Sequence, residues 1–240
     1  MQIKAVLQSV ILACILAELA AARKNKKNKN PKKSVQTRNF EKRDISTKQV
    51  CVDVVFVVQN SHNVETMLFG ADLYIKYFST MFDKSSGISL VTYSSAAQQV
   101  LPLMSNSEFK KVYSEAYLKS PTQTNEANTI DALEFVNRNI KDLFPKPSNG
   151  RLIILFTEGV TITSTVNNED INEKLKAQIT SLQRNKVKIA PINYDFDFDS
   201  AEFDLYESTS IKQSTVKNEF HMTEDFRVEF QDCINNEFHC

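Results

Sequence analysis

Two nearly continuous apolar runs dominate the hydrophobic pattern of the chain. The first covers residues 52–58 (VDVVFVV) and the second covers residues 152–156 (LIILF). Such runs are typical of parallel strands that helices cover on both faces of a sheet. Short polar loops follow at residues 59–63 and 157–159. Because ligands of open α/β sheets bind at the carboxyl ends of the strands, we expect these two loops to be neighbours on a binding face.

Strand-like and helical segments alternate through the rest of the chain. Apolar residues at helical spacing predict helices over 67–82, 130–144, 171–182 and 226–234, and other apolar segments predict strands at 88–93, 99–103, 187–193 and near 220. A further short helix is expected between residues 193 and 220. The strands at 88–93 and 99–103 are joined by so short a connection that they must form an antiparallel hairpin. The predicted fold is α/β, a doubly wound, mostly parallel sheet with one antiparallel edge strand and helices on both faces, over residues 50–237.

The chain begins with two segments that we expect to lie outside this domain. Residues 1–22 combine Lys4, an apolar stretch and a small-residue cleavage pattern, which predicts a secretory signal peptide. The apolar stretch is too short for a membrane span, which needs about 20 residues. A retained anchor is the alternative. Residues 23–49 form a basic arm, interpreted as a solvated tail, as an attachment to anionic polymers, or as a pro-segment that is cleaved at Lys42-Arg43.

The charge balance of the chain hides two opposite regions. The formal net charge is +0, but residues 44–240 contain 18 Lys or Arg and 27 Asp or Glu, a balance of −9. Nucleic acid is therefore excluded as the main partner, because phosphate recognition needs a basic surface. No later segment is apolar enough to span a membrane.

The loops after the two apolar runs carry a resemblance to a known family. VVFVVQNSHN and LIILFTEG resemble the first and fourth strands of the von Willebrand factor A domain, also called the integrin I domain. The resemblance implies a metal-ion-dependent adhesion site with an Asp and two Ser from one loop, a Thr from a second and an Asp from a third. The matching first-loop positions are Gln59, Ser61 and Asn63, and Glu158 takes the last position. Ala127 falls where the Thr belongs, although a shifted loop offers Thr124 or Thr129.

These substitutions change what the site can bind. Two carboxylates of the family pattern have become one, because Gln59 supplies a carbonyl oxygen without charge, and Glu158 is one methylene longer than Asp. A hard cation prefers charged oxygen ligands in fixed geometry. We therefore predict no metal cofactor and at most weak Mg²⁺ or Ca²⁺ binding. The alternative is a polar cluster that only caps the following helix.

An acidic and aromatic run follows the strand at 187–193. Asp195, Phe196 and Asp197 are predicted to form a contact rim beside the loops, since aromatic residues are enriched at protein interfaces. The alternative is that the Phe side chains are tucked into the core. The run is not an EF-hand, because Ser200 and Tyr206 stand where that motif needs Gly and Glu.

Three cysteines remain once the predicted signal peptide is removed. We predict a disulfide between Cys51 and Cys233, because the last helix should return beside the first strand. Many secreted domains of the resembled family carry such a bridge between their ends. Cys240, in the tail 238–240, is then left over and predicts a disulfide-linked oligomer.

Catalysis finds little support in the sequence motifs. The chain lacks the G-x-S-x-G, H-E-x-x-H, P-loop and G-x-G-x-x-G patterns. We therefore predict a secreted, extracellular binding or adhesion module that contacts an extracellular or matrix protein, not an enzyme. The alternative is a structural or carrier component of a matrix or surface coat, with no dedicated ligand on the loops.

Overall fold

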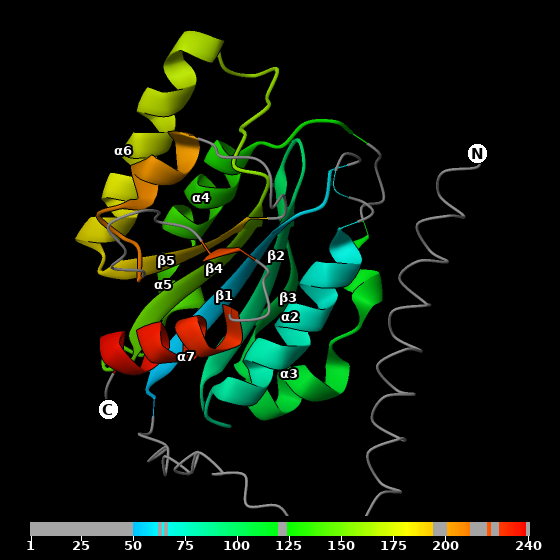
Figure 1. Cartoon of the computed structure of the whole chain (residues 1–240), viewed down its shortest axis with the longest axis vertical. Helices are drawn as coiled ribbons and strands as arrows, with labels where there is room; N and C mark the ends of the chain where they lie inside the picture. The colour runs from blue at the N-terminus through cyan, green and yellow to red at the C-terminus, as the bar shows by residue number, and fades with distance from the viewer. Residues whose placement is uncertain are drawn as a thin grey trace, which may run out of the picture. The chain divides into compact units, whose positions relative to one another are not determined.

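The computed structural model describes residues 50–61, 64, 67–119, 124–193, 201–211, 220–221 and 226–238. Within them, one six-stranded sheet has the strand order β3-β2-β1-β4-β5-β6 (Figure 1). The strands are β1 (Val52–Gln59), β2 (Gly87–Tyr93), β3 (Ala97–Ser105), β4 (Gly150–Thr157), β5 (Val187–Asn193) and β6 (Phe220–His221). The helices are α2 (Leu68–Met81), α3 (Asn106–Val112), α4 (Thr129–Arg138), α5 (Ile140–Leu143), α6 (Ile171–Arg184) and α7 (Phe226–Glu237). Short 3-10 helices are η2 (Glu115–Leu118), η3 (Asn168–Asp170) and η4 (Ala201–Tyr206).

The sheet confirms the predicted fold class. β1 pairs in parallel with β2 and β4, β4 with β5, and β5 with β6, while β2 and β3 are antiparallel. Every residue of β1 is buried, which explains why its sequence is apolar without alternation. The predicted doubly wound, mostly parallel sheet with one antiparallel edge strand is therefore correct.

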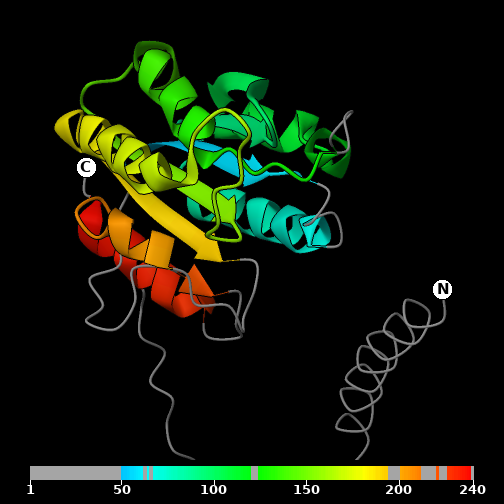
Figure 2. The same cartoon turned by 90° about the horizontal axis from the view of Figure 1, so that it is seen from above.

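Alternate residues of the central strands fill two hydrophobic cores on opposite faces of the sheet. Val54 and Phe56 belong to the core that also contains residues of α2 and α7, and Val55 and Val57 belong to the core with α4 and α6. Figure 2 shows α6 and α7 on opposite sides of the sheet. In the first core, the Phe78 ring lies 4.3 Å from Phe230 and 6.3 Å from Phe156, measured between ring centroids.

The edge strand β3 departs from regular pairing. Its register with β2 shifts between Ile88 and Leu90 and again between Leu90 and Val91. The exposed Pro102 lies within the strand. Proline has no N–H to donate to a neighbouring strand, so it is tolerated on an edge.

The end of α7 lies beside the start of β1. The backbone N of Gly150 donates to the carbonyl of Cys51 at 2.8 Å, and the Phe238 ring covers Gly150 so closely that a Cβ there would lie 2.2 Å from it. The predicted return of the last helix to the first strand is correct.

The predicted pairing of Cys51 with Cys233 is wrong. Cys51 is disulfide-bonded, but its bond is not to Cys233. Cys233 lies inside α7 and packs, partly buried, against the core that also contains residues of β1 and α2. The partner of Cys51 lies outside the described residues. So does Cys240, and the disulfide-linked oligomer stays a prediction.

The predicted signal peptide, the basic arm, Asn63 and the acidic rim Asp195 to Asp197 also lie outside the described residues. None of the helices in the described part of the chain combines the length and the apolar character that a membrane crossing requires.

Candidate functional site

The loops after β1 and β4 meet at one edge of the sheet, as predicted. The strands are in register, with Val58 opposite Phe156, so Gln59 and Thr157 end side by side. Gln59 and Ser61 are fully buried, and Glu158 is half-buried. The structure thus brings together three of the predicted site residues.

The Gln59 side chain is the centre of this cluster. Its carbonyl oxygen accepts from the backbone N of Glu158 at 3.0 Å and from the Thr157 hydroxyl at 3.3 Å. Its amide nitrogen donates to the Ser61 hydroxyl oxygen at 2.9 Å and lies 3.4 Å from Glu158 Oε2. A backbone N–H can only donate, so the oxygen of Gln59 must face Glu158 N and the NH₂ group must face Ser61.

Thr129 joins the site from behind. It is fully buried at the first residue of α4, and its hydroxyl lies 3.4 Å from the hydroxyl of Tyr93. The Thr157 side chain also lies near the Tyr93 hydroxyl, so buried polar side chains line the way from Thr129 to Gln59. Burial raises the pKa of Tyr93 far above its ordinary value, and the phenol keeps its proton. Sequence analysis missed Tyr93, because its residue type and position are those of an ordinary strand end.

The second loop carries Ala127 at the position where the resemblance expects a threonine. Ala127 is fully buried and exchanges two backbone hydrogen bonds with Ile162, of 2.8 and 3.0 Å. Ile162 itself is 41% exposed, although sequence analysis did not single it out. This pairing fixes the loop at 124–128 against the loop after β4.

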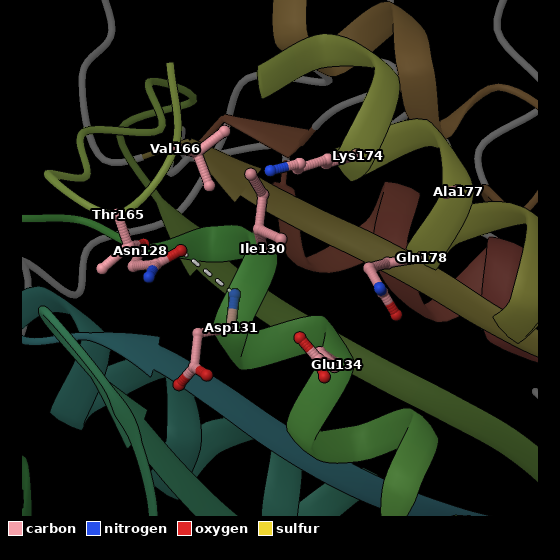
Figure 3. A pocket seen from close by; sticks show the side chains of 9 residues that line it. All are labelled: Asn128, Ile130, Asp131, Glu134, Thr165, Val166, Lys174, Ala177 and Gln178. Atoms are coloured by element: carbon pink, nitrogen blue, oxygen red, sulfur yellow. Dashed lines mark hydrogen bonds between the residues drawn. The ribbon is translucent and has the colours of Figure 1, made fainter. Parts of the chain in front are cut away.

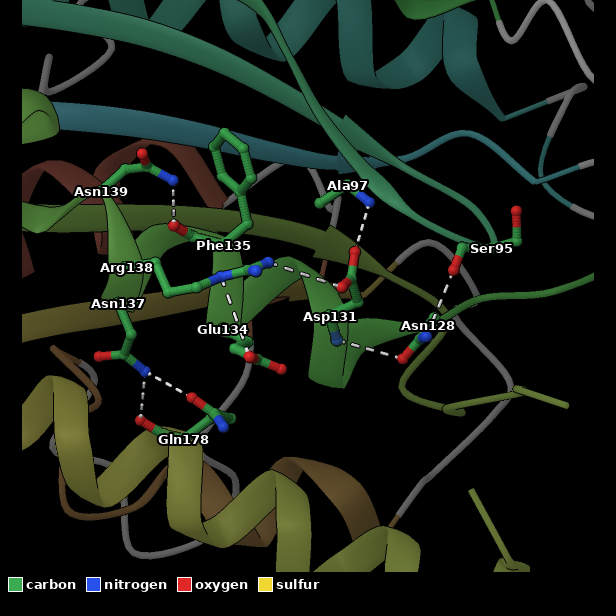
Figure 4. A network of polar contacts seen from close by, with 10 residues as sticks. All are labelled: Ser95, Ala97, Asn128, Asp131, Glu134, Phe135, Asn137, Arg138, Asn139 and Gln178. Carbon is green, nitrogen blue, oxygen red and sulfur yellow. Dashed lines mark hydrogen bonds and ion pairs between the residues drawn. The ribbon is translucent and has the colours of Figure 1, made fainter. Parts of the chain in front are cut away.

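Helix α4 is anchored at its start by a polar network (Figure 4). The Asn128 side chain accepts from the backbone N of Asp131 at 3.1 Å, which caps the helix. One carboxylate oxygen of Asp131 accepts from the backbone N of Ala97 at 2.6 Å. The network therefore connects the second loop to the hairpin between β2 and β3.

A buried glutamate supports the loop after β4 from below. Glu202, on η4, is 7% exposed and accepts from the backbone N and the hydroxyl of Thr161, at 2.8 and 2.9 Å. Its other oxygen accepts from the Tyr206 hydroxyl at 3.4 Å. On the same helix, Phe203 packs under Gly159, which has a φ of 72°. Sequence analysis expected only a short helix here, and no local pattern marks Glu202.

Burial raises the pKa of Glu202 above its ordinary value of 4.5, while hydrogen bonds from Thr161 act in the opposite direction. A pKa that is higher in the folded state stabilises the fold below the unfolded pKa, and this contribution is lost as the pH rises through the folded pKa. Glu202→Gln cannot ionise at this position. We therefore expect its melting temperature to rise relative to that of the wild type as the pH is raised above 4.5. Thermal unfolding of both proteins across pH measures the difference. A constant difference, or the same trend in the exposed Glu207→Gln, would contradict this assignment.

The described donor groups do not fit the metal ion that the resemblance implies. The Gln59 NH₂ group points at the oxygens of Ser61 and Glu158, so an ion between them would meet hydrogens in place of an oxygen ligand. Ala127 has no side-chain oxygen. In the described part of the chain, no group of three or more His, Cys, Asp or Glu side chains could hold an ion.

One protein-family model matches this chain. The family model of the von Willebrand factor type A domain matches residues 53–236. No curated protein sequence is similar enough to this chain to count as a match.

Solved structures share the fold at low sequence identity. Proximal thread matrix protein 1 from the mussel byssus is 14% identical, with a TM-score of 0.59 over 78% of this chain and 49% of that chain. The same mussel protein with a zinc-occupied MIDAS motif is 14% identical, with a TM-score of 0.57 over 78% and 49%. The von Willebrand factor domain of the type V pilus tip protein Mfa5 from Porphyromonas gingivalis is 11% identical, with a TM-score of 0.55 over 78% and 95%.

The chain spans about half the length of the mussel structures, and at these identities the likeness shows the fold alone. The family model, by contrast, covers most of the chain, from the second residue of β1 almost to the end of α7. The chain belongs to the von Willebrand factor type A domain family.

Proposed function

We propose that this chain is a protein-binding module that contacts its partner through the loop face, without an ion shared between the two proteins. The loop face comprises residues 59–63, 124–129 and 158–164. The observation that carries the proposal is the Gln59 amide, which lies between the oxygens of Ser61 and Glu158 and satisfies both of them.

The chemistry of the loop face then decides what the partner offers. An ion-containing site attracts an acidic group, because the ion has open coordination positions. Without an ion, the half-buried carboxylate of Glu158 favours a Lys or Arg of the partner. Polar side chains of Thr163 and Ser164 and the exposed Ile162 extend this surface. A contact rim at Asp195, Phe196 and Asp197 remains part of the proposal.

The proposed setting is extracellular, and the proposed role is binding and adhesion without catalysis. The disulfide of Cys51 supports an oxidising compartment, where such bonds persist. Removal of residues 1–22 as a signal peptide agrees with this setting. Solved structures with the same fold include a byssus matrix protein and a pilus tip protein. By analogy with them, we propose an extracellular or matrix protein as the partner.

A second candidate is a structural or carrier component whose loop face has no dedicated ligand. The burial of Gln59, Ser61 and Thr129 favours it, because these side chains stabilise the loops from inside. The two candidates differ in whether substitutions on the loop face change binding.

The test begins with capture of extracellular proteins by the purified secreted chain, followed by affinity measurements on the partner. We expect the affinity to survive EDTA, to weaken with added salt, and to fall by up to about fivefold in Glu158→Gln, as for a rim-exposed ion pair. Calorimetric titration should detect no Mg²⁺, Mn²⁺ or Ca²⁺ binding tighter than roughly millimolar.

The matched control removes a carboxylate elsewhere on the surface. Asp142→Asn lies on α5, outside the loop face, and should leave the affinity unchanged. Loss of binding in EDTA would refute the proposed mechanism. Equal affinities for Glu158→Gln and the wild type would favour the structural candidate.

A further inference from the structure

A cavity of about 320 Å³ opens beside the loop face, between α4 and α6 (Figure 3). Its lining residues are Asn128, Ile130, Asp131, Glu134, Thr165, Val166, Lys174, Ala177 and Gln178. Its size is near the lower end of the range for ligand pockets, so it accommodates about one residue of a partner. The cavity is separate from the Gln59 cluster, and of the residues that line it only Asn128 belongs to the loop face.

The two helices give the cavity walls of opposite chemistry. On α4, the Glu134 side chain is 45% exposed and its carboxylate accepts no hydrogen bond among the described residues. On α6, Lys174 extends its ammonium group over the cavity, and Figure 3 shows it on the side opposite Glu134. No ion pair within 4.0 Å joins Lys174 to Glu134 or to any other described residue. The cavity therefore presents an acceptor on one wall and a charged donor on the other.

Further groups extend this polarity. The carbonyl oxygen of the Gln178 side chain accepts from Asn137 at 2.8 Å, so the NH₂ group of Gln178 adds a donor to the α6 wall. The apolar side chains of Ile130, Val166 and Ala177 contribute to the lining, and Ile130 is only 6% exposed. A ligand that matches the cavity carries a cation at one end, an anion at the other and an aliphatic stem between them.

The chain itself shows which cation suits the α4 wall. The guanidinium group of Arg138 lies 3.9 Å from both Asp131 and Glu134, and its side chain is 61% exposed. Figure 4 shows it reaching along the helix to both carboxylates. Ion pairs this long and exposed are weak, so a guanidinium group from a ligand can compete with Arg138.

We propose that this cavity binds a C-terminal arginine of a partner protein. Its guanidinium group pairs with Glu134, its aliphatic stem lies along Ile130 and Val166, and its carboxylate pairs with Lys174. This inference rests on the proposed function only in assuming a protein partner. The cavity can be tested with small probes before any partner is known.

The probes are three small molecules, titrated into the ¹⁵N-labelled chain and followed by amide shifts in NMR spectra. Nα-acetyl-L-arginine carries both charges and should shift the amides of Val166, Ala177 and Gln178, with a Kd on the order of millimolar for a ligand of this size. Nα-acetyl-L-citrulline lacks the positive charge and N-acetylagmatine lacks the carboxylate. Each should bind at least about fivefold more weakly.

Three variants assign the two ends of the probe. Glu134→Gln should weaken the binding of acetylarginine about fivefold without changing that of acetylcitrulline. Lys174→Gln should weaken the binding of acetylarginine without changing that of N-acetylagmatine. Arg138→Gln removes the guanidinium group that competes within the chain, so it should strengthen the binding of acetylarginine. The control is Glu169→Gln, an exposed acid on η3 outside the cavity, which should change none of these values.

Equal binding of acetylarginine and acetylcitrulline would overturn the proposal, as would shifts confined to residues outside the cavity. Nα-acetyl-L-lysine serves as the last comparison. If it binds as tightly as acetylarginine or more tightly, the cavity does not prefer a guanidinium group and the proposed arginine is wrong. Because no partner takes part, failure of these titrations leaves the EDTA and Glu158→Gln tests of the loop face standing, and the reverse also holds.

Discussion

Gln59→Leu is expected to lower the free energy of unfolding by about 3 kcal/mol. Leucine fills a similar volume, so the loss comes from hydrogen bonding and not from a cavity. The substitution leaves the buried hydroxyl of Thr157 and the part-buried backbone N–H of Glu158 without the oxygen that now accepts from them. For a domain of this size the melting temperature should fall by roughly 6 to 12 °C. Urea and thermal unfolding measure both quantities.

A matched variant separates the roles of the two ends of the amide. Gln59→Glu keeps an acceptor for Glu158 N but replaces the NH₂ group by a carboxylate oxygen. The Gln59 nitrogen that this oxygen replaces lies 3.4 Å from Glu158 Oε2, so two carboxylates would face each other. The two negative charges should make this variant gain stability on addition of Mg²⁺ or Mn²⁺. Gln59→Leu and the wild type should not respond. An equal response of the wild type would mean that the amide does not take the place of an ion.

Gly159→Ala is expected to destabilise the domain by about 3 kcal/mol. Two effects add up. The φ of 72° lies in the left-handed region, where a Cβ is strained, and that Cβ would lie 2.3 Å from the Phe203 ring. Because Gly159 follows Glu158 directly, relief of the contact should also displace the carboxylate from Gln59.

The double variant Gly159→Ala with Phe203→Leu isolates the steric part. A smaller side chain under the loop removes the ring atoms that the new methyl group would meet, so the two substitutions should destabilise less together than the sum of their separate effects. Chemical denaturation of the four proteins gives this coupling directly. Additive effects, or a loss below about 1 kcal/mol for Gly159→Ala alone, would show that the loop adapts to the methyl group at little expense.

The fold could be predicted because its information is local. The runs at 52–58 and 152–156 are apolar because both faces of these strands are buried. The polar residues that follow them mark the carboxyl edge of the sheet. The meeting of Gln59, Ser61 and Glu158 follows from the parallel pairing of β1 with β4. These features depend on strand direction and not on side-chain packing.

The remaining features of the site depend on contacts between distant segments. Glu202 lies 41 residues from Thr161, and only the folded chain shows that its carboxylate supports the loop after β4. Thr129 matched the family pattern by residue type, yet it faces Tyr93 because α4 begins at that residue. The predicted cysteine pairing depended on such a contact too, because only the folded chain shows what Cys233 on α7 packs against.

The irregular edge strand β3 has a consequence for behaviour at high concentration. A straight edge strand offers a row of unpaired N–H and C=O groups that recruits other chains into cross-β aggregates. In this domain the exposed Pro102 and the register shifts against β2 interrupt that row, and β6 spans only two residues within the described part of the chain. We therefore expect the β3 edge to resist strand-to-strand fibre growth when the protein is concentrated.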